Sequence, residues 1–210
     1  MELTYGRYLK VEELLQLQQP LSEGPEHDEM LFIIIHQVYE LWFKQILHEL
    51  EKLKSSFQEG ERGKALHTLK RIRSILKVLV SQVDVLETMT PLEFLSFRER
   101  LQSASGFQSC QFRELEFTLG LKNPKHLEHY PQGSEERNRL EKKIEEPSLW
   151  EVFLQFLSSL GHDSPKLKEG GRSIEPPDSS EDIQDLLEKI YRNHPDSALV
   201  CEMLTDLDEG

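Results

Sequence analysis

Residues 28–57 read DEMLFIIIHQVYELWFKQILHELEKLKSSF, and this stretch decides the fold. It contains neither Pro nor Gly, and most of its residues favour a helix. Its apolar residues recur at helical spacing, namely Leu31, Ile34, Val38, Leu41, Leu47 and Leu50. The pattern predicts one helix of roughly 30 residues, about 45 Å long at 1.5 Å per residue.

Further helical patterns follow, separated by short breaks such as the one at Gly60 and Gly63. No segment alternates with a period of two and is rich in β-branched residues, as a strand would be. The fold is therefore predicted to be all-α, a bundle of long helices in one domain. The further helices are expected near residues 66–86, 91–101, 108–119, 135–145, 149–161, 181–192 and 196–208.

Several helix ends carry their own signals. Thr90 is followed by Pro91 and Glu93, and this order predicts a capping box at the start of a helix. Ser148 and Glu151 repeat the box, while Gly120 is placed to end a helix. Residues 162–180 contain repeated Pro and Gly breaks and are expected to form a mobile loop.

The totals exclude several classes of partner. The chain of 210 residues carries a formal net charge of −13, so neither nucleic acid nor an anionic membrane surface is an expected partner. The longest apolar run, Met30 to His36, is too short to span a bilayer, and the N-terminus lacks the order of a signal peptide. Two cysteines without CxxC spacing give no disulfide framework. A cytoplasmic protein is expected.

Arg98 occupies an unusual position, because it shares the apolar stripe of Phe94, Phe97 and Leu101. A guanidinium cannot lose its proton, so in an apolar place it needs an anionic partner. One interpretation is an internal pair with Glu87, Glu114 or Glu116, or a stem that snorkels outward. The other is a fork aimed at the carboxylate of a ligand.

His36 is similarly ambiguous, because it interrupts the most apolar part of its helix. Phe32, His36 and Glu40 follow one another at intervals of four residues. The histidine is either a half-buried partner of Glu40 or an imidazole that faces a cavity and exchanges a hydrogen bond near neutral pH.

Other chemistry has little support. The Glu-x-x-His pairs of a di-iron bundle and the GxSxG frame of a hydrolase are both missing from the sequence. The loop SASGFQS remains, because Gly106 allows close approach of a ligand, and Ser105 lies just before a helix N-terminus.

Four blocks, in this order, resemble tryptophan 2,3-dioxygenases: LTYGRYL, HDEMLFIIIHQVYELWFKQ, LETMTPLEFLSFR and SGFQSCQFRELEFTLG. The resemblance covers Leu3 to Leu121 and continues more loosely to the end, where EPSLWEVFLQFL also fits. It implies an all-α enzyme with haem b. The implied reaction joins both atoms of O2 to the indole C2–C3 bond of L-tryptophan and gives N-formylkynurenine, the first step of the kynurenine pathway. A homotetramer is the implied assembly.

The resemblance also implies roles for individual residues. Arg98 resembles the arginine that binds the substrate carboxylate, and His36 the distal histidine that hydrogen-bonds the indole N–H. Phe32 and Phe94 resemble walls of the indole pocket. The remaining matches are the loop over haem and substrate, and an N-terminal segment that reaches a neighbouring subunit's pocket: Ser105, Gly106 and Phe107, then Tyr5, Tyr8 and Leu9.

One part of the family pattern has no match. The proximal haem-ligating histidine and a Gly/Thr-rich loop of the family follow the segment matched by LTDLDEG at the end of the chain. None of the eight histidines matches the proximal one. The expectation is that the polypeptide continues past Gly210. The competing hypothesis is a haem-free helical binding or scaffold protein that keeps the fold without turnover.

Overall fold

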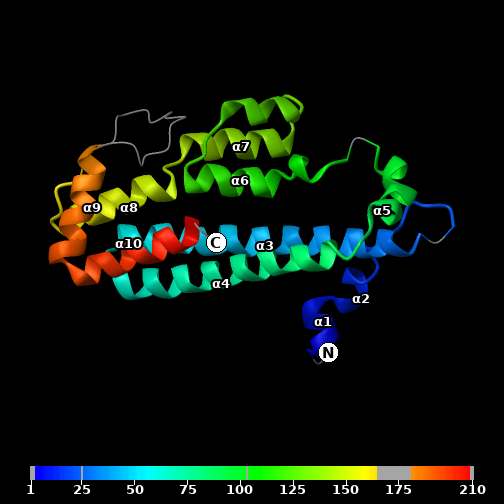
Figure 1. Ribbon diagram of the computed structural model, residues 1–210, viewed down its shortest axis with the longest axis horizontal. Coiled ribbons are helices and arrows are strands. Elements are labelled where there is room, and N and C mark those ends of the chain that lie inside the picture. Colours follow the sequence, from blue (N-terminus) through cyan, green and yellow to red (C-terminus); the bar gives the residue numbers. More distant parts are fainter. Residues whose placement is uncertain (1–2, 25, 103, 165–180, 209–210) are drawn as a thin grey trace.

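Two long antiparallel helices form the spine of the molecule. The computed structural model describes residues 3–24, 26–102, 104–164 and 181–208, and no β-strand occurs among them. The spine consists of α3 (His27–Gln58) and α4 (Arg62–Leu86), which lie side by side along the longest axis (Figure 1). The predicted long helix is confirmed, and so is the all-α fold. Gly60 lies in the connecting turn with a φ of +71°, whereas Gly63 is already helical.

Shorter helices are arranged around this spine. Above α3 lie α6 (Cys110–Leu119), α7 (Glu135–Glu145) and α8 (Leu149–Ser159), and α5 (Pro91–Arg98) crosses its N-terminal end (Figure 1). At the opposite end, α9 (Glu181–Asn193) leads into α10 (Pro195–Asp208), which packs on α4. Three short 3-10 turns occur among the described residues, after α5 and on either side of α6: η1 (Glu99–Leu101), η2 (Gly106–Gln108) and η3 (Pro124–His129).

The predicted helix ends are present in the structure. Thr90 and Glu93 form a capping box, and Ser148 and Glu151 form the second one. Gly120 ends α6 with a φ of +128°, a conformation that favours glycine. The predicted loop over residues 162–180 lies outside the described residues from 165 onward.

The main apolar core fills only one half of the bundle. It joins the C-terminal half of α3 to α4, α8, α9 and α10, and its fully buried members include Leu50, Leu53, Phe57, Leu69 and Phe156. Arg71 on α4 crosses to the buried Glu49 on α3, with one guanidinium nitrogen 3.0 and 3.2 Å from the two carboxylate oxygens. The N-terminal half of α3 lies largely beyond this core, and most of its residues are partly exposed. That half is therefore free to line a site.

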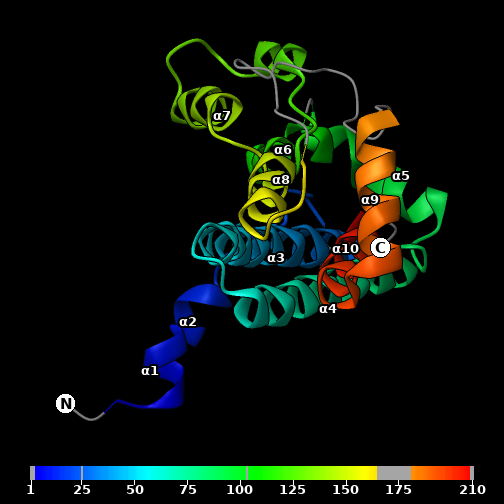
Figure 2. The ribbon, with the colours of Figure 1, turned by 90° about the vertical axis from the view of Figure 1, so that its left-hand side faces the viewer.

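Two further short helices precede the spine. These are α1 (Tyr5–Leu9) and α2 (Val11–Leu14), neither of which was predicted from the sequence. Neither contains a buried residue, and together they project away from the bundle as an N-terminal arm, defined here as residues 3–15 (Figure 2). Within the described ranges, no helix has both the length and the apolar character needed to cross a membrane.

Candidate functional site

Aromatic side chains line the half-buried part of α3. Phe32, His36, Tyr39 and Phe43 follow one another at intervals of four, three and four residues, so they share one face of the helix. All four are partly exposed. A face of this kind, next to a well-packed core, is suited to contact a flat apolar ligand.

The structure brings Phe32, His36 and Phe94 together. The ring of Phe32 lies 4.1 Å from that of His36 and 5.9 Å from that of Phe94, measured between centroids. Phe97, which is fully buried, holds this group in place, with centroids 5.5 Å from both Phe32 and Phe94. The contact between α3 and α5 thus places the two predicted pocket walls beside the predicted distal histidine.

The hydrogen bond of His36 defines its tautomer. Nδ1 lies 2.7 Å from the backbone carbonyl oxygen of Phe32, and because a carbonyl can only accept, Nδ1 carries the proton. In the neutral ring Nε2 is then an acceptor with a free lone pair. The alternative pair with Glu40 is not formed, since the Glu40 carboxylate accepts a hydrogen bond from Gln111 on α6 instead.

Arg98 lies one helical turn after Phe94 and is exposed. One guanidinium nitrogen donates to the backbone carbonyl of Gln102 at 3.2 Å. The alternative partners Glu114 and Glu116 are paired with Arg139 and Arg113. Across the described parts of the chain, Arg98 has no carboxylate partner of its own, so its charge is available to an anionic ligand.

The part of the SASGFQS loop next to α6 forms a capping box. Ser105 accepts a hydrogen bond from the N–H of Phe107 at 3.3 Å, and the Gln108 side chain bonds back to the N–H of Ser105. A Cβ added to Gly106 would meet nothing within 4 Å. Phe107 itself is 79% exposed, so most of its ring surface is not packed against other described residues. The structure does not bring these three residues into contact with the Phe32, His36 and Phe94 group.

The predicted N-terminal residues also lie apart from that group. Tyr5 is 78% exposed and Tyr8 is 72% exposed on α1, and Leu9 is exposed beside them. Figure 2 shows α1 projecting from the molecule rather than folding over α5. In a single chain these side chains therefore contribute nothing to the site on α3.

The residues present fit one side of a porphyrin. Phe43 on α3 contacts Phe112 on α6 at 5.5 Å between ring centroids, and the exposed Phe107 lies in the loop just before that helix. Phe32, His36 and Phe43 share one face of α3, and with Phe112 on α6 they give a half-covered aromatic wall whose polar acceptor is Nε2 of His36, while Phe107 lies outside this wall. A flat apolar macrocycle with one polar contact is the kind of group that such a wall can bind.

Sequence reasoning did not predict a histidine pair at the opposite end of the bundle. The rings of His162 and His194 are 4.6 Å apart, and they line a depression of about 310 Å³ together with Arg62 and Ser197. His162 Nε2 is 3.0 Å from the Ser197 hydroxyl, so that ring is already bonded within the protein. No group of three or more His, Cys, Asp or Glu side chains that could hold a metal ion occurs in the residues that the structure describes.

Comparison with known proteins identifies similar chains. A family model described as tryptophan 2,3-dioxygenase matches residues 1–196. A tryptophan 2,3-dioxygenase from Herpetosiphon aurantiacus is 52% identical over 208 residues, which cover 99% of this chain and 80% of that relative. One from Anaeromyxobacter sp. (strain K) is 51% identical over 209 residues, covering 99% and 77%. One from Xanthomonas oryzae pv. oryzae is 41% identical over 209 residues, covering 98% and 70%.

Proposed function

The chain belongs to the tryptophan 2,3-dioxygenase family, and we propose that L-tryptophan binds against the aromatic group of Phe32, His36 and Phe94. The function is oxidation of L-tryptophan by O2 to N-formylkynurenine, the first step of the kynurenine pathway.

The tautomer of His36 is the observation that supports this site best. Its Nδ1–H is used by the Phe32 carbonyl, so Nε2 is left to accept a hydrogen bond. The indole ring of tryptophan has one N–H, which can only donate. His36 is thus prepared to bind the polar edge of the substrate, while Phe32 and Phe94 contact its flat apolar faces.

Arg98 is assigned to the amino-acid end of the substrate. It is exposed and lies one turn from Phe94, and the acceptor that it has among the described residues is the backbone carbonyl of Gln102. The planar guanidinium can bind a carboxylate through two parallel hydrogen bonds. Such a fork fixes the rotation of the substrate as well as its position, so the N–H edge of the indole ring is directed toward His36.

Haem is the cofactor that the family generally uses, and the half-covered aromatic wall fits it. Ser105, Gly106 and Phe107 would cover one side of the macrocycle, and Phe43 and Phe112 belong to the wall beside them. When bound, haem supplies the iron chemistry that activates O2. The protein's own part is to orient the indole, hold its N–H at His36, and exclude water with aromatic rings.

A homo-oligomer, with a tetramer as the specific proposal, would complete the site. The exposed aromatic residues of the N-terminal arm, Tyr5 and Tyr8, are the part of the chain that would enter a neighbour's pocket. Large aromatic side chains that are exposed in one chain are typical of surfaces that another chain covers. In this assembly α1 projects from its own chain because it would bind to a neighbouring one.

Spectroscopy and a product assay test the proposal together. The purified protein, supplied with haem and a reductant, is expected to have a Soret band and to convert L-tryptophan to N-formylkynurenine. His36→Leu should retain the Soret band and lose affinity for L-tryptophan. A similar loss in the exposed variant His48→Leu would contradict the assignment, as would full affinity in His36→Leu. A protein with native helix content, no Soret band and no product would favour the haem-free binding protein instead.

A further inference from the structure

A buried carboxylate lies in the first turn of α3. Glu29 is only 1% exposed, yet no basic side chain forms an ion pair with it within the described ranges. Its two carboxylate oxygens accept hydrogen bonds from the backbone N–H groups of Leu21 and Ser22, at 2.7 and 3.1 Å. Glu29 therefore binds the chain segment just before its own helix. Both of its oxygens are thus used to hold residues 21 and 22 in place.

Gln37 makes a second pair of bonds to the same segment, two turns further along α3. Its amide nitrogen donates to the carbonyl of Leu17 at 3.1 Å, and its amide oxygen accepts from the Gln18 side chain at 2.6 Å. Both polar ends of Gln37 are thus bonded to residues 17 and 18. Two side chains that lie eight residues apart on α3 hold residues 17–22 at both ends.

The segment held in this way carries the N-terminal arm. Residues 16–22 lie in the connection between α2 and α3, and neither α1 nor α2 buries a residue in the core. Apolar packing therefore contributes little to the position of the arm. The hydrogen bonds of Glu29 and Gln37 attach its base to the bundle.

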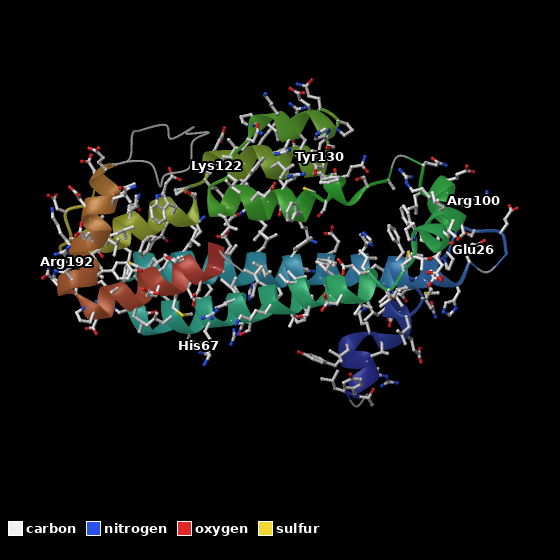
Figure 3. The ribbon with its side chains drawn as sticks, in the orientation of Figure 1. Glu26, His67, Arg100, Lys122, Tyr130 and Arg192 are labelled. Carbon is white, nitrogen blue, oxygen red and sulfur yellow. The ribbon has the colours of Figure 1, made fainter. Side chains whose placement is uncertain are left out.

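The charge of Glu29 is maintained in this environment. Burial alone would raise the pKa of the Glu29 carboxyl, but the hydrogen bonds from Ser22 and from the backbone of Leu21, with the nearby charge of Arg100, lower its pKa below the ordinary value. Arg100 follows α5, at the same end of the molecule (Figure 3). At neutral pH the carboxylate is thus ionised, and hydrogen bonds to an ionised acceptor are the stronger kind.

We propose that Glu29 and Gln37 are positioning residues, which dock the base of the N-terminal arm on α3 and so set where the arm points. The proposal rests on the proposed function in one respect, because the arm matters for turnover only if Tyr5 and Tyr8 complete a neighbour's site. His36 and Gln37 are adjacent on α3, about 100° apart around the helix. The helix α3 therefore carries His36 of its own site and also Gln37, which anchors the arm that would enter the site of a neighbouring subunit.

Hydrogen exchange on the full chain tests the docking directly. Glu29→Gln removes the charge and one of the two acceptor oxygens, and Gln37→Ala removes both of that residue's bonds. Each variant is expected to raise the exchange rate of amides in residues 17–22 by about tenfold or more, with helix content nearly unchanged. The matched controls are the exposed Glu26→Gln and Gln58→Ala at the two ends of α3. Exchange that is unchanged in both variants would overturn the proposal.

Kinetics on the haem-loaded enzyme separate this proposal from the proposed function. A displaced arm should raise the KM for L-tryptophan severalfold with a smaller effect on kcat, and deletion of residues 1–9 should do the same. If Glu29→Gln speeds exchange while that deletion leaves turnover intact, docking by Glu29 is supported and the role of the arm in the site is refuted. If the deletion impairs turnover while neither variant alters exchange, the arm functions without this anchor and the proposal fails. Gln37 is half-exposed, so Gln37→Ala is expected to fold even if Glu29→Gln does not, and unchanged exchange of residues 17–22 in Gln37→Ala would then overturn the proposal.

Discussion

Gln111 on α6 donates two hydrogen bonds to Glu40 on α3, one to its backbone carbonyl at 2.9 Å and one to its carboxylate at 2.7 Å. Glu40 lies one turn after His36, and Gln111 lies at the start of the helix that follows the SASGFQS loop. This contact therefore fixes the distance between the helix of the predicted distal histidine and the loop that is proposed to cover the haem. It also occupies the carboxylate that would otherwise be the natural partner of His36.

Gln111→Ala should destabilise the protein by about 1 to 2 kcal/mol, because a half-buried carboxylate then loses its donor. The difference would be measured by urea unfolding at neutral pH. The exposed Gln155→Ala on α8 is the matched control and should change the free energy of unfolding by less than about 0.5 kcal/mol. If the two variants have the same free energy of unfolding, the contact between Gln111 and Glu40 does not contribute to stability.

Arg98→Lys should weaken binding of L-tryptophan by about 1.5 to 3 kcal/mol, since an ammonium cannot form the charge-assisted fork. Fold stability should change little, because the only hydrogen bond that the Arg98 guanidinium makes within the described ranges goes to the exposed Gln102 carbonyl. Arg100→Lys, two residues further on and also exposed, is the control. Calorimetric titration with L-tryptophan provides the measurement. Unchanged affinity in Arg98→Lys would remove this residue from the site.

Local signals made most of the fold predictable. The long helix over residues 27–58 follows from composition and apolar spacing, and the boxes at Thr90 and Ser148 fix two helix starts within a few residues of sequence. The arm helices were missed because segments of four and five residues have too little sequence for a periodic pattern. The turn over Pro124–His129 is 3-10, which apolar periodicity does not distinguish from a loop.

The site was less accessible to this reasoning. Spacing placed Phe32 and His36 on one face of a helix, but only the packing of α5 brings Phe94 to that face. The apolar stripe around Arg98 left an internal pair, an outward stem and a ligand fork open, and the structure shows the side chain exposed. The bonds from Glu29 to Leu21 and Ser22, and from Gln111 to Glu40, depend on how separate segments meet in space. Periodicity within one helix identifies a face and not the neighbour that covers it.

Deletion of residues 1–9 should impair turnover and leave the fold intact. The deleted part contains α1, whose residues are all exposed, so its loss uncovers no core. Far-ultraviolet circular dichroism should lose only the small contribution of one short helix, and the urea midpoint should stay the same. Turnover of L-tryptophan by the haem-loaded protein is the decisive measurement. Full activity would show that the N-terminal tyrosines are dispensable.

Both cysteines should be unreactive in the native protein. Burial raises the pKa of the Cys110 thiol to about 11, and burial raises the pKa of the Cys201 thiol to about 11. At pH 7 the reactive thiolate is then about one part in ten thousand. A disulfide reagent such as Ellman's should label neither residue over minutes, and should label both in denaturant. Rapid labelling of the folded protein would show that one of these helices opens easily.

Stability should decline as the pH falls from about 7 toward 5, partly because of His162. Burial lowers the pKa of the His162 ring, and the neighbouring His194 and Arg62 lower it further. Between the folded pKa and the ordinary value near 6.5, the unfolded chain binds more protons than the folded one, so acid favours unfolding. Protonation would also force His162 to give up any acceptor role toward the Ser197 hydroxyl, 3.0 Å away at the start of α10.

His162→Asn should reduce the pH dependence of the unfolding free energy between about pH 7 and 5, because asparagine does not titrate. Part of the dependence should remain, since burial also lowers the pKa of the His126 ring. The exposed His48→Asn serves as the control and should keep the slope of the unmodified protein. Urea unfolding at several pH values gives the slope directly. If His162→Asn has the same slope as the unmodified protein, protonation of His162 does not change the free energy of unfolding in this pH range.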